Sequence, residues 1–232
     1  YKKGLYPWIQ PLFYPPSGVA PSPGILYDRK NGTGGAEMID KRDVIAFFDK
    51  RAAAWDAEMI RHEPVIQAIL DNAGVGDGAR VLDVACGTGV LFPDYLARGA
   101  SVTGIDISPE MARIAAAKFT GEPRVQVLCG DVEETVFPET FDVVMVYNAF
   151  PHFPDPARLM ARLASLVRPG GRLSVAHGMS RAAIDSHHNG AAHPVSNGLM
   201  HEDALRALLT PYCDVDICIS DERMYQVAGI RR

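Results

Sequence analysis

The stretch VLDVACGTGV, residues 81–90, joins a short apolar run to a glycine-rich turn and carries an aspartate inside the run. Its aliphatic and β-branched residues predict a buried strand. Gly87 and Gly89 follow, and glycine lets a backbone approach a ligand with no side chain between them. Asp83 stands just before the turn, where its carboxylate can accept hydrogen bonds from backbone amides or an ammonium group. The stretch therefore predicts a strand that ends in a ligand-binding turn.

Strands and helices alternate along the chain around this turn. Ser108-Pro109 and Asp155-Pro156 predict helix starts, because serine and aspartate cap helices and proline is favoured at the first helical position. Such alternation predicts a mostly parallel sheet covered on both faces. The predicted strands are 81–85, 101–106, 124–129, 142–147, 172–177, 213–219 and 224–231, and the predicted helices are near 90–98, 109–119, 156–168 (ended by RPGG at 168–171) and 201–210.

The 232 residues have an ordinary composition for a globular protein, with 47% hydrophobic and 22% charged residues. The net charge of −5 and the pI of about 5.8 provide no global positive field for nucleic acid phosphates. No apolar run approaches the roughly 18–20 residues that span a bilayer, and the first residues lack the pattern of a signal peptide. The four cysteines include no CxxC pair, which favours a reduced, cytoplasmic protein.

We expect two regions in the chain. Residues 1–37 are rich in proline and aromatic residues and show no strand or helix period, so they predict an extended arm. Residues 38–232 then form a single domain. Within this domain, 38–75 has the apolar spacing of helices, precedes the first strand and is expected to form a helical N-terminal lid, whereas 178–200 is an insertion rich in histidine.

The turn and the next strand together indicate the kind of ligand. Asp106 ends the second predicted strand, where a carboxylate is placed to accept hydrogen bonds from both ribose hydroxyls. The dinucleotide fingerprint needs a third glycine after Gly89, and Val90, Leu91 and Phe92 follow instead. No GxxxxGK[ST] phosphate loop occurs either. The pattern therefore favours a ligand with a ribose and an adenine but no pyrophosphate.

Five motifs in this order and spacing resemble one family. VLDVACGTG, VTGIDISPEM, LCGDVEE, FDVVMVYNAFPHF and LVRPGGRLSVAH are similar to the class I S-adenosylmethionine-dependent methyltransferases, most of all to the small-molecule enzymes of ubiquinone and menaquinone type. The resemblance covers residues 42–178 strongly and the remainder loosely. It implies an α/β, Rossmann-like fold: a mostly parallel seven-stranded sheet with an antiparallel last strand and helices on both faces.

The resemblance also implies a set of residues that hold the cofactor, S-adenosyl-L-methionine, and its product S-adenosyl-L-homocysteine. The first strand and its turn would hold the methionine part, the second and third strand ends the ribose and adenine, and the fourth strand end would border the reacting methyl. Plain core packing is the alternative for Ile107, Met111 and Val132. The full set is Asp83, Ala85, Cys86, Gly87, Gly89, Asp106, Ile107, Met111, Asp131, Val132, Asn148 and Phe150.

Two further segments resemble parts of the family's active site. The helix FFDKRAAAWD resembles its N-terminal lid, so Phe47, Arg51 and Trp55 would close over the cofactor, with ordinary helix packing as the alternative. His152, just past the fourth strand, lies where an acceptor would sit. An imidazole there can deprotonate an acceptor hydroxyl or shape the pocket.

Five of the seven histidines lie in residues 177–201, which include the insertion. His177 leaves the fifth strand at its carboxyl end and is a second candidate catalytic residue. A helical turn from Ser180 would project His187 or His188 back towards the cleft. Converging neutral imidazoles can bind a transition metal, with His177, His187, His188 and His193 as candidates. No standard zinc spacing occurs, and histidines on a polar loop are the simpler interpretation.

The leading hypothesis is a cytoplasmic methyltransferase acting on a small-molecule acceptor, without nucleic acid or membrane partners, as a monomer or homodimer. The alternative is a metal-binding or metal-handling protein that keeps the fold and uses the histidines of 177–201. A nicotinamide oxidoreductase is a weaker alternative because the third glycine is absent. A protein-methylating enzyme also stays open, because an acceptor peptide leaves no motif in this chain.

Overall fold

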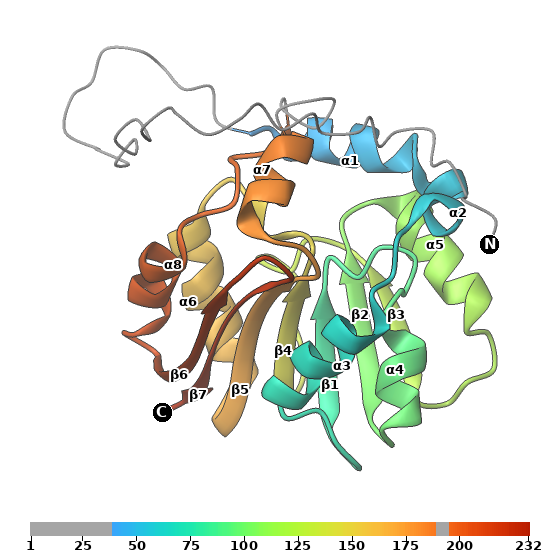
Figure 1. The fold of residues 1–232 in the computed structure, drawn as a ribbon. Coiled ribbons are helices and arrows are strands. Elements are labelled where there is room, and N and C mark those ends of the chain that lie inside the picture. Colours follow the sequence, from blue (N-terminus) through green and yellow to red (C-terminus); the bar gives the residue numbers. More distant parts are fainter. Residues whose placement is uncertain (1–38, 189–194) are drawn as a thin grey trace, which may run out of the picture. The chain divides into compact units, whose positions relative to one another are not determined.

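The computed structural model describes residues 39–188 and 195–232 (Figure 1), apart from the side chains of His187 and His188. The predicted arm, 1–37, and His193 lie outside these residues. Among the described residues, seven strands form one sheet in the order β3-β2-β1-β4-β5-β7-β6. The strands are β1 (Arg80–Val84), β2 (Ser101–Asp106), β3 (Val125–Cys129), β4 (Phe141–Tyr147), β5 (Val167–His177), β6 (Cys213–Ser220) and β7 (Tyr225–Arg231).

The directions of the strands confirm the predicted fold class. β1 pairs in parallel with β2 and with β4, β2 pairs in parallel with β3, and β4 pairs in parallel with β5. The last strand, β7, is antiparallel to both of its neighbours, β5 and β6. The strand order reverses between β1 and β4, and in open parallel sheets a ligand cleft forms at this switch point, beyond the carboxyl ends of the strands.

The helices begin where the sequence predicts. Asp40, Ser108 and Asp155 each accept a hydrogen bond from the first turn of the helix that follows, as N-cap residues do. The helices are α1 (Lys41–Asp49), η1 (Ala52–Ala54), α2 (Trp55–Glu58), α3 (Glu63–Asn72), α4 (Phe92–Ala97), α5 (Pro109–Lys118), η2 (Phe150–His152), α6 (Pro156–Leu166), α7 (Arg181–His188) and α8 (Glu202–Leu209).

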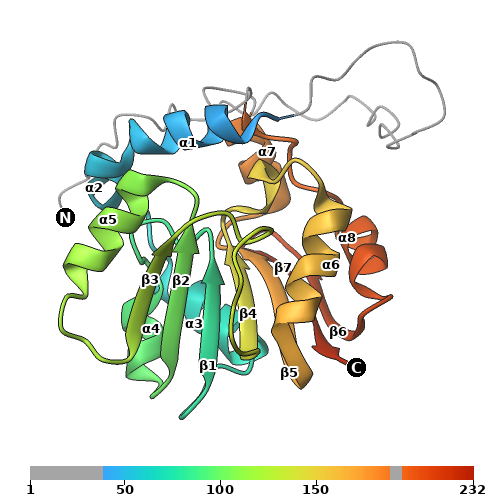
Figure 2. The ribbon, with the colours of Figure 1, turned by 180° about the vertical axis from the view of Figure 1, so that it is seen from behind.

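Successive residues of the central strands point to opposite faces and bury two separate hydrophobic clusters. In β4, Val143 and Met145 pack in the cluster that holds α3 and α4, whereas Val144 and Val146 pack with α6 and α8. Figures 1 and 2 show these two pairs of helices on opposite faces of the sheet. Because both faces of the sheet are covered, the central strands are largely apolar, and the buried acid Asp83 in β1 is an exception.

The start of β5 differs from the prediction. RPGG was expected to end a helix before a strand at 172, but the strand already begins at Val167, directly after α6. Val167 pairs with Phe141, and the register then shifts before Val143. Gly170 has a φ of +74°, and a side-chain carbon at Gly171 would lie 2.7 Å from the Asp142 carbonyl oxygen. The glycines therefore permit an irregular but paired strand start.

The predicted N-terminal lid, 38–75, divides into two parts. α3 belongs to the core, because Ile66, Ile69 and Leu70 are buried in the same cluster as α4. α1, η1 and α2 instead cross the carboxyl end of the strands, as Figure 1 shows for α1. This shorter segment, 41–58, is called the lid below.

Candidate functional site

A cavity lies between the lid and the carboxyl ends of β1, β2, β3 and β4. Its empty space, counted out through the mouth and including open solvent, is about 1110 Å³. The predicted residues that line it are Trp55, Asp83, Ala85, Cys86, Gly87, Asp106, Ile107, Met111, Asp131, Val132, Asn148 and His152. The sequence motifs, spread over about a hundred positions, therefore converge on one place.

Asp106 ends β2 with both carboxylate oxygens held by backbone. The amide of Gly87 donates to one oxygen at 2.8 Å, and the amide of Ser108 donates to the other at 2.8 Å. Burial raises the pKa of Asp106 to about 6, against the lowering effect of these two hydrogen bonds. Each carboxylate oxygen retains lone-pair capacity, so the fixed carboxylate can accept further hydrogen bonds from a pair of vicinal hydroxyls.

Asp83 lies on the same side of the cavity and is almost completely buried. Burial raises its pKa to about 8, and the nearby Asp106 carboxylate adds to the increase while the Tyr95 hydroxyl opposes it. A buried carboxyl next to a second acid favours a cationic ligand, because such a ligand would stabilise the ionised form. Asp83 therefore suits the ammonium group of an amino acid.

Left-handed backbone marks both strand ends that flank the switch point. Ala85, after β1, has a φ of 54°, and Asn148, after β4, has a φ of 55°. Non-glycine residues rarely adopt this conformation, and such strain concentrates at functional sites. Gly87 adopts it as well, and the Trp55 indole nitrogen lies 3.8 Å from the position that a side-chain carbon of Gly87 would take. The turn thus passes directly beneath the lid.

Gly89 and Cys86 serve packing around the turn. Gly89 does not line the cavity, and a side-chain carbon there would lie 2.9 Å from the Phe92 ring of α4. Cys86 is buried, and its sulfur occupies space that Gly104 of β2 leaves open. Burial raises the pKa of the Cys86 thiol, so this group is a neutral wall of the cavity.

The lid is fixed to the elements that carry these residues. Asp49, at the end of α1, accepts hydrogen bonds from the Ser108 hydroxyl at 2.5 Å and the Glu110 amide at 3.2 Å. Asp56, in α2, accepts from the Thr88 hydroxyl at 2.5 Å and from the Lys118 ammonium at 2.8 Å. The lid is therefore hydrogen-bonded to the glycine turn and to α5. The glycine turn and the start of α5 both lie beside Asp106.

The other end of the cavity is aromatic. His152 packs edge-on against Phe48 of the lid, with ring centroids 5.0 Å apart. Its Nδ1 lies 2.7 Å from the Val195 carbonyl oxygen. A carbonyl oxygen can only accept, so Nδ1 carries the proton and the lone pair of the neutral ring is on Nε2. The ring therefore has the tautomer of a base whose acceptor nitrogen is Nε2.

Asn148 and Tyr147 form the polar part of this end. The Gly178 amide donates to Asn148 Oδ1 at 2.9 Å, which fixes the orientation of the side-chain amide. A side-chain carbon at Gly178 would lie 2.5 Å from the Tyr147 hydroxyl, so glycine is needed for this ring to lie there. Burial raises the pKa of Tyr147 to about 12, and the Asn148 side chain opposes the rise. The tyrosine is therefore neutral at physiological pH.

Several predicted residues do not line the cavity. Phe150 is buried in the core, and Phe47 lies under the Arg51 guanidinium at 3.6 Å on the lid. His177 is 1% exposed and packs edge-on against Tyr225, with ring centroids 6.0 Å apart. The side chains of His187 and His188, together with His193, lie outside the described residues. The role predicted for His177 thus has no support from the lining of the cavity.

The metal hypothesis also gains no support here. Within 39–188 and 195–232, no group of three or more His, Cys, Asp and Glu side chains is arranged to hold a metal ion. Nor does any helix in that part of the chain have the length and apolarity to cross a membrane.

The structure adds residues that sequence patterns did not single out. Lys41, Val44 and Phe48 reach the cavity from α1, and Met59 follows α2. The helical spacing of α1 indicated an apolar face but not which surface it covers. Tyr147 and Phe153 belong to a quoted motif, FDVVMVYNAFPHF, and Pro154 follows it directly. Their positions close to Asn148 and His152 in the sequence were the available signal.

Known proteins share both the sequence pattern and the fold. Residues 82–175 match a family described as "Methyltransferase domain". The ubiquinone biosynthesis O-methyltransferase of Aeromonas salmonicida is 34% identical over 146 residues, 59% of this chain and 61% of that one. The nocamycin O-methyltransferase of Saccharothrix syringae is 38% identical over 135 residues, 55% of this chain and 48% of that one. The chain thus matches about half to three fifths of the length of these relatives.

Solved structures agree at lower identity. Magnesium protoporphyrin IX methyltransferase from Synechocystis, solved with bound S-adenosylhomocysteine, superposes with a TM-score of 0.63 at 19% identity, covering 83% of this chain and 100% of that one. The N-methyltransferase NodS from Bradyrhizobium japonicum, also with S-adenosylhomocysteine, gives 0.62 at 15% identity, covering 81% and 97%. These likenesses establish the fold.

The reversed strand order and the glycine turn after β1 define a Rossmann-like α/β fold. Residues 82–175 match the methyltransferase domain family, and the chain is similar to class I S-adenosylmethionine-dependent methyltransferases in sequence and in fold.

Proposed function

We propose that the protein transfers a methyl group from S-adenosyl-L-methionine to a small-molecule acceptor, releasing S-adenosyl-L-homocysteine. One observation carries the proposal: the buried carboxyls of Asp83 and Asp106 line one cavity beside the glycine turn. Asp106 has the fixed, backbone-held carboxylate that ribose hydroxyls require, and Asp83 has the environment that an ammonium group would stabilise. The donors and acceptors of the cavity therefore fit the two polar ends of this cofactor.

The cofactor supplies an electrophilic methyl on a sulfonium centre, so the chain's main tasks are to bind, orient and exclude water. Asp83 and the turn at Ala85–Gly87 would hold the amino-acid part, and Asp106 the ribose. Ile107, Met111 and Val132, which line the cavity, would bury the adenine faces. Phe48 and Trp55 of the lid cover the cavity and limit the access of water.

We propose further that the acceptor carries a hydroxyl and that His152 removes its proton. The bond from Nδ1 to the Val195 carbonyl leaves Nε2 as the basic nitrogen, and the residue lines the cavity at its aromatic end. The two relatives named above are O-methyltransferases, which is consistent with a hydroxyl acceptor. The aromatic lining, with Phe48 and Phe153, favours an acceptor with an apolar or aromatic body.

We propose a cytoplasmic enzyme without nucleic acid partners. All four cysteines are free thiols, as expected in a reducing compartment, and the net charge is −5. The sequence prediction of a monomer or homodimer stays a prediction.

Calorimetric titration with S-adenosylmethionine and S-adenosylhomocysteine tests the proposal directly. We expect the product to bind with a dissociation constant in the micromolar range or below and to compete with the methyl donor. An adenosine titration serves as control, because it lacks the amino-acid part that Asp83 would bind. Binding of neither sulfur compound, by a protein that unfolds cooperatively on heating, would contradict the proposal.

A further inference from the structure

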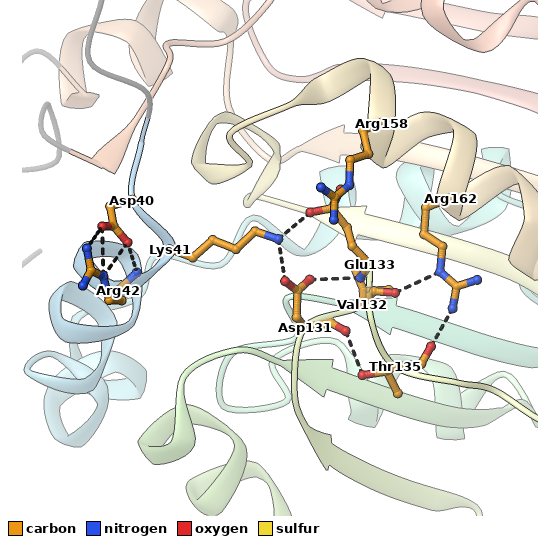
Figure 3. Close-up of polar contacts among 9 residues, drawn as sticks. All are labelled: Asp40, Lys41, Arg42, Asp131, Val132, Glu133, Thr135, Arg158 and Arg162. Carbon is orange, nitrogen blue, oxygen red and sulfur yellow. Dashed lines mark hydrogen bonds and ion pairs between the residues drawn. The ribbon is translucent and has the colours of Figure 1, made fainter.

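Lys41 of the lid forms ion pairs with two acids at the rim of the cavity that are far from Lys41 in the sequence. Its ammonium group lies 2.5 Å from Asp131 Oδ2 and 2.5 Å from Glu133 Oε2 (Figure 3). Both acids follow β3, whereas Lys41 is the first residue of α1. The side chains of Lys41, Asp131 and Glu133 are 31%, 15% and 6% exposed, so the contact is largely sheltered from solvent.

The two acids sit in a segment that is held on its other side as well. Figure 3 shows Arg158 and Arg162 of α6 reaching it from the side opposite Lys41. The Arg158 guanidinium lies 3.0 Å from Glu133 Oε1. Arg162 donates to the carbonyl oxygens of Val132 and Thr135, at 3.1 and 2.5 Å. The rim segment, residues 131–135, is therefore fixed independently of the lid, and Lys41 attaches the lid to a rigid partner.

The contact also determines how Asp131 faces the cavity. Its Oδ1 accepts from the Glu133 amide at 2.9 Å, and its Oδ2 accepts from Lys41. With both oxygens anchored, the carboxylate has one orientation and keeps lone-pair capacity for a ligand. Lys41, Asp131 and Val132 all line the cavity, next to Ile107. Removal of the ammonium would leave Asp131 without its cationic partner and next to the acid Glu133, which would keep its ion pair with Arg158.

We propose that Lys41 is a positioning residue that couples closure of the lid to recognition of the purine edge of the bound nucleoside. The inference rests on the proposed function. Asp131, held by Lys41, accepts from an exocyclic amino group on the purine, and the same ion pair keeps α1 across the cavity. A purine with an oxo group at this position presents an acceptor to the carboxylate instead of a donor, and it is bound less well.

Burial lowers the pKa of Lys41, but the hydrogen bonds to Asp131 and Glu133 raise it above its usual value overall. The side chain is therefore charged throughout the range in which the protein is handled. We expect the coupling to weaken with ionic strength, because the Lys41 side chain is still 31% exposed.

The test compares Lys41→Met, Lys41→Arg and a matched control, Lys50→Met. Lys50 caps the other end of the same helix and is exposed. Calorimetry is done with S-adenosylhomocysteine and with its 6-oxo analogue, S-inosylhomocysteine, at 0.05 and 0.5 M salt. Stopped-flow measurement gives the rate of ligand release, and thermal unfolding reports on the fold.

For Lys41→Met we expect about 10-fold weaker S-adenosylhomocysteine binding at low salt, most of it through faster release, and a lower preference over the 6-oxo analogue. Lys41→Arg should restore most of the affinity and most of the preference over the 6-oxo analogue, and Lys50→Met should match the wild type in both quantities. Unchanged affinity and preference in Lys41→Met would overturn this inference alone. An equal loss for both ligands would show a merely structural role and also overturn it. Absence of binding by the wild type would overturn the proposed function together with the inference.

Discussion

The two halves of the cleft are built in different ways. On the nucleoside half, the polar groups sit at the ends of β1 and β2 and are fixed by backbone, as the two amide bonds to Asp106 show. On the acceptor half, Phe48 comes from the lid, His152 from η2, and the carbonyl that orients His152 from Val195. Under the proposed function, a local motif would bind the nucleoside, whereas side chains that only the tertiary fold brings together would bind the acceptor.

A substitution of His152 tests the difference between the two halves most directly, because it should change the transfer rate without changing the affinity for the product. His152→Asn keeps a donor for the Val195 carbonyl but removes the basic Nε2. We expect the rate of methyl transfer to fall about 100-fold, as loss of a general base does, with unchanged affinity for S-adenosylhomocysteine. The rate is measured in single turnovers with isotope-labelled methyl donor on a panel of small phenols and alcohols.

His152→Gln is the matched control, because its amide extends to the position of Nε2 and loses the bond to Val195. Equal rates for both variants and the wild type would show that His152 only shapes the pocket. A loss of product affinity in His152→Asn would contradict the division of the cleft into two halves.

Asp106 gives the corresponding test of the nucleoside half. Asp106→Ala removes the ribose acceptor and frees the amides of Gly87 and Ser108. We expect S-adenosylhomocysteine affinity to fall by about 1–3 kcal/mol, roughly 5- to 150-fold, by calorimetry. Asp203→Ala, an exposed acid in the first turn of α8, should bind normally. Unchanged affinity in Asp106→Ala would remove its assignment to the ribose.

Substitution of Asp83, in the nucleoside half, should change ligand affinity and folding stability in opposite directions. Its pKa is raised from 3.8 to about 8 in the folded protein, so the stability present below pH 4 is lost as the pH rises towards 8. Asp83→Asn removes this ionisation. We therefore expect the variant without ligand to melt several degrees above the wild type at pH 8, at about 2–4 °C per kcal/mol, while its affinity for S-adenosylhomocysteine falls.

Thermal unfolding at pH 5.5 and pH 8.5 provides the control for Asp83→Asn, because the difference in melting temperature should grow with pH. A variant that is less stable than the wild type at both values would show that the carboxylate is paired rather than strained in the folded protein.

The same division explains what the sequence could predict. The strand ends and the residues Asp83, Gly87 and Asp106 follow from short apolar runs that stop at glycines and acids, because local chemistry fixes them. Ser108 and Asp155 marked helix starts for the same reason. These features depend on neighbours in sequence, and the structure places them as expected.

Long-range contacts were beyond the reach of these patterns. The ion pairs of Lys41 join residues separated by 90 and 92 positions. Lys41 has no sequence signature, and the LCGDVEE motif does not indicate that its acids contact the lid. His177 looked equivalent to His152 in sequence, since each follows a strand at its carboxyl end. Packing decides between them: His152 lines the cavity, whereas His177 lies in the core against Tyr225.

The smallest expected effects are on stability and concern the two non-glycine residues with left-handed backbone, Ala85 in the nucleoside half and Asn148 in the acceptor half. Ala85→Gly removes a side chain from a backbone with a φ of 54°. The relief of about 1–2 kcal/mol exceeds the 0.4–1 kcal/mol that a more flexible unfolded chain costs, so we expect a gain of about 0.5 kcal/mol in urea unfolding. Asn148→Gly relieves the same strain but loses the bond from the Gly178 amide, so we expect a loss of about 1 kcal/mol.

Ala116→Gly, at an exposed position of α5, calibrates both measurements, because glycine in a regular helix costs about 1 kcal/mol. If Ala85→Gly costs as much as Ala116→Gly, the turn after β1 is not strained, and the methyl group of Ala85 instead stabilises the folded turn by packing. If Asn148→Gly is as stable as the wild type, the bond to Gly178 contributes nothing net, and the left-handed conformation after β4 alone orients the acceptor half. Opposite signs for Ala85→Gly and Asn148→Gly would mean that backbone strain on the nucleoside half has no local compensation, whereas on the acceptor half a side-chain hydrogen bond offsets it.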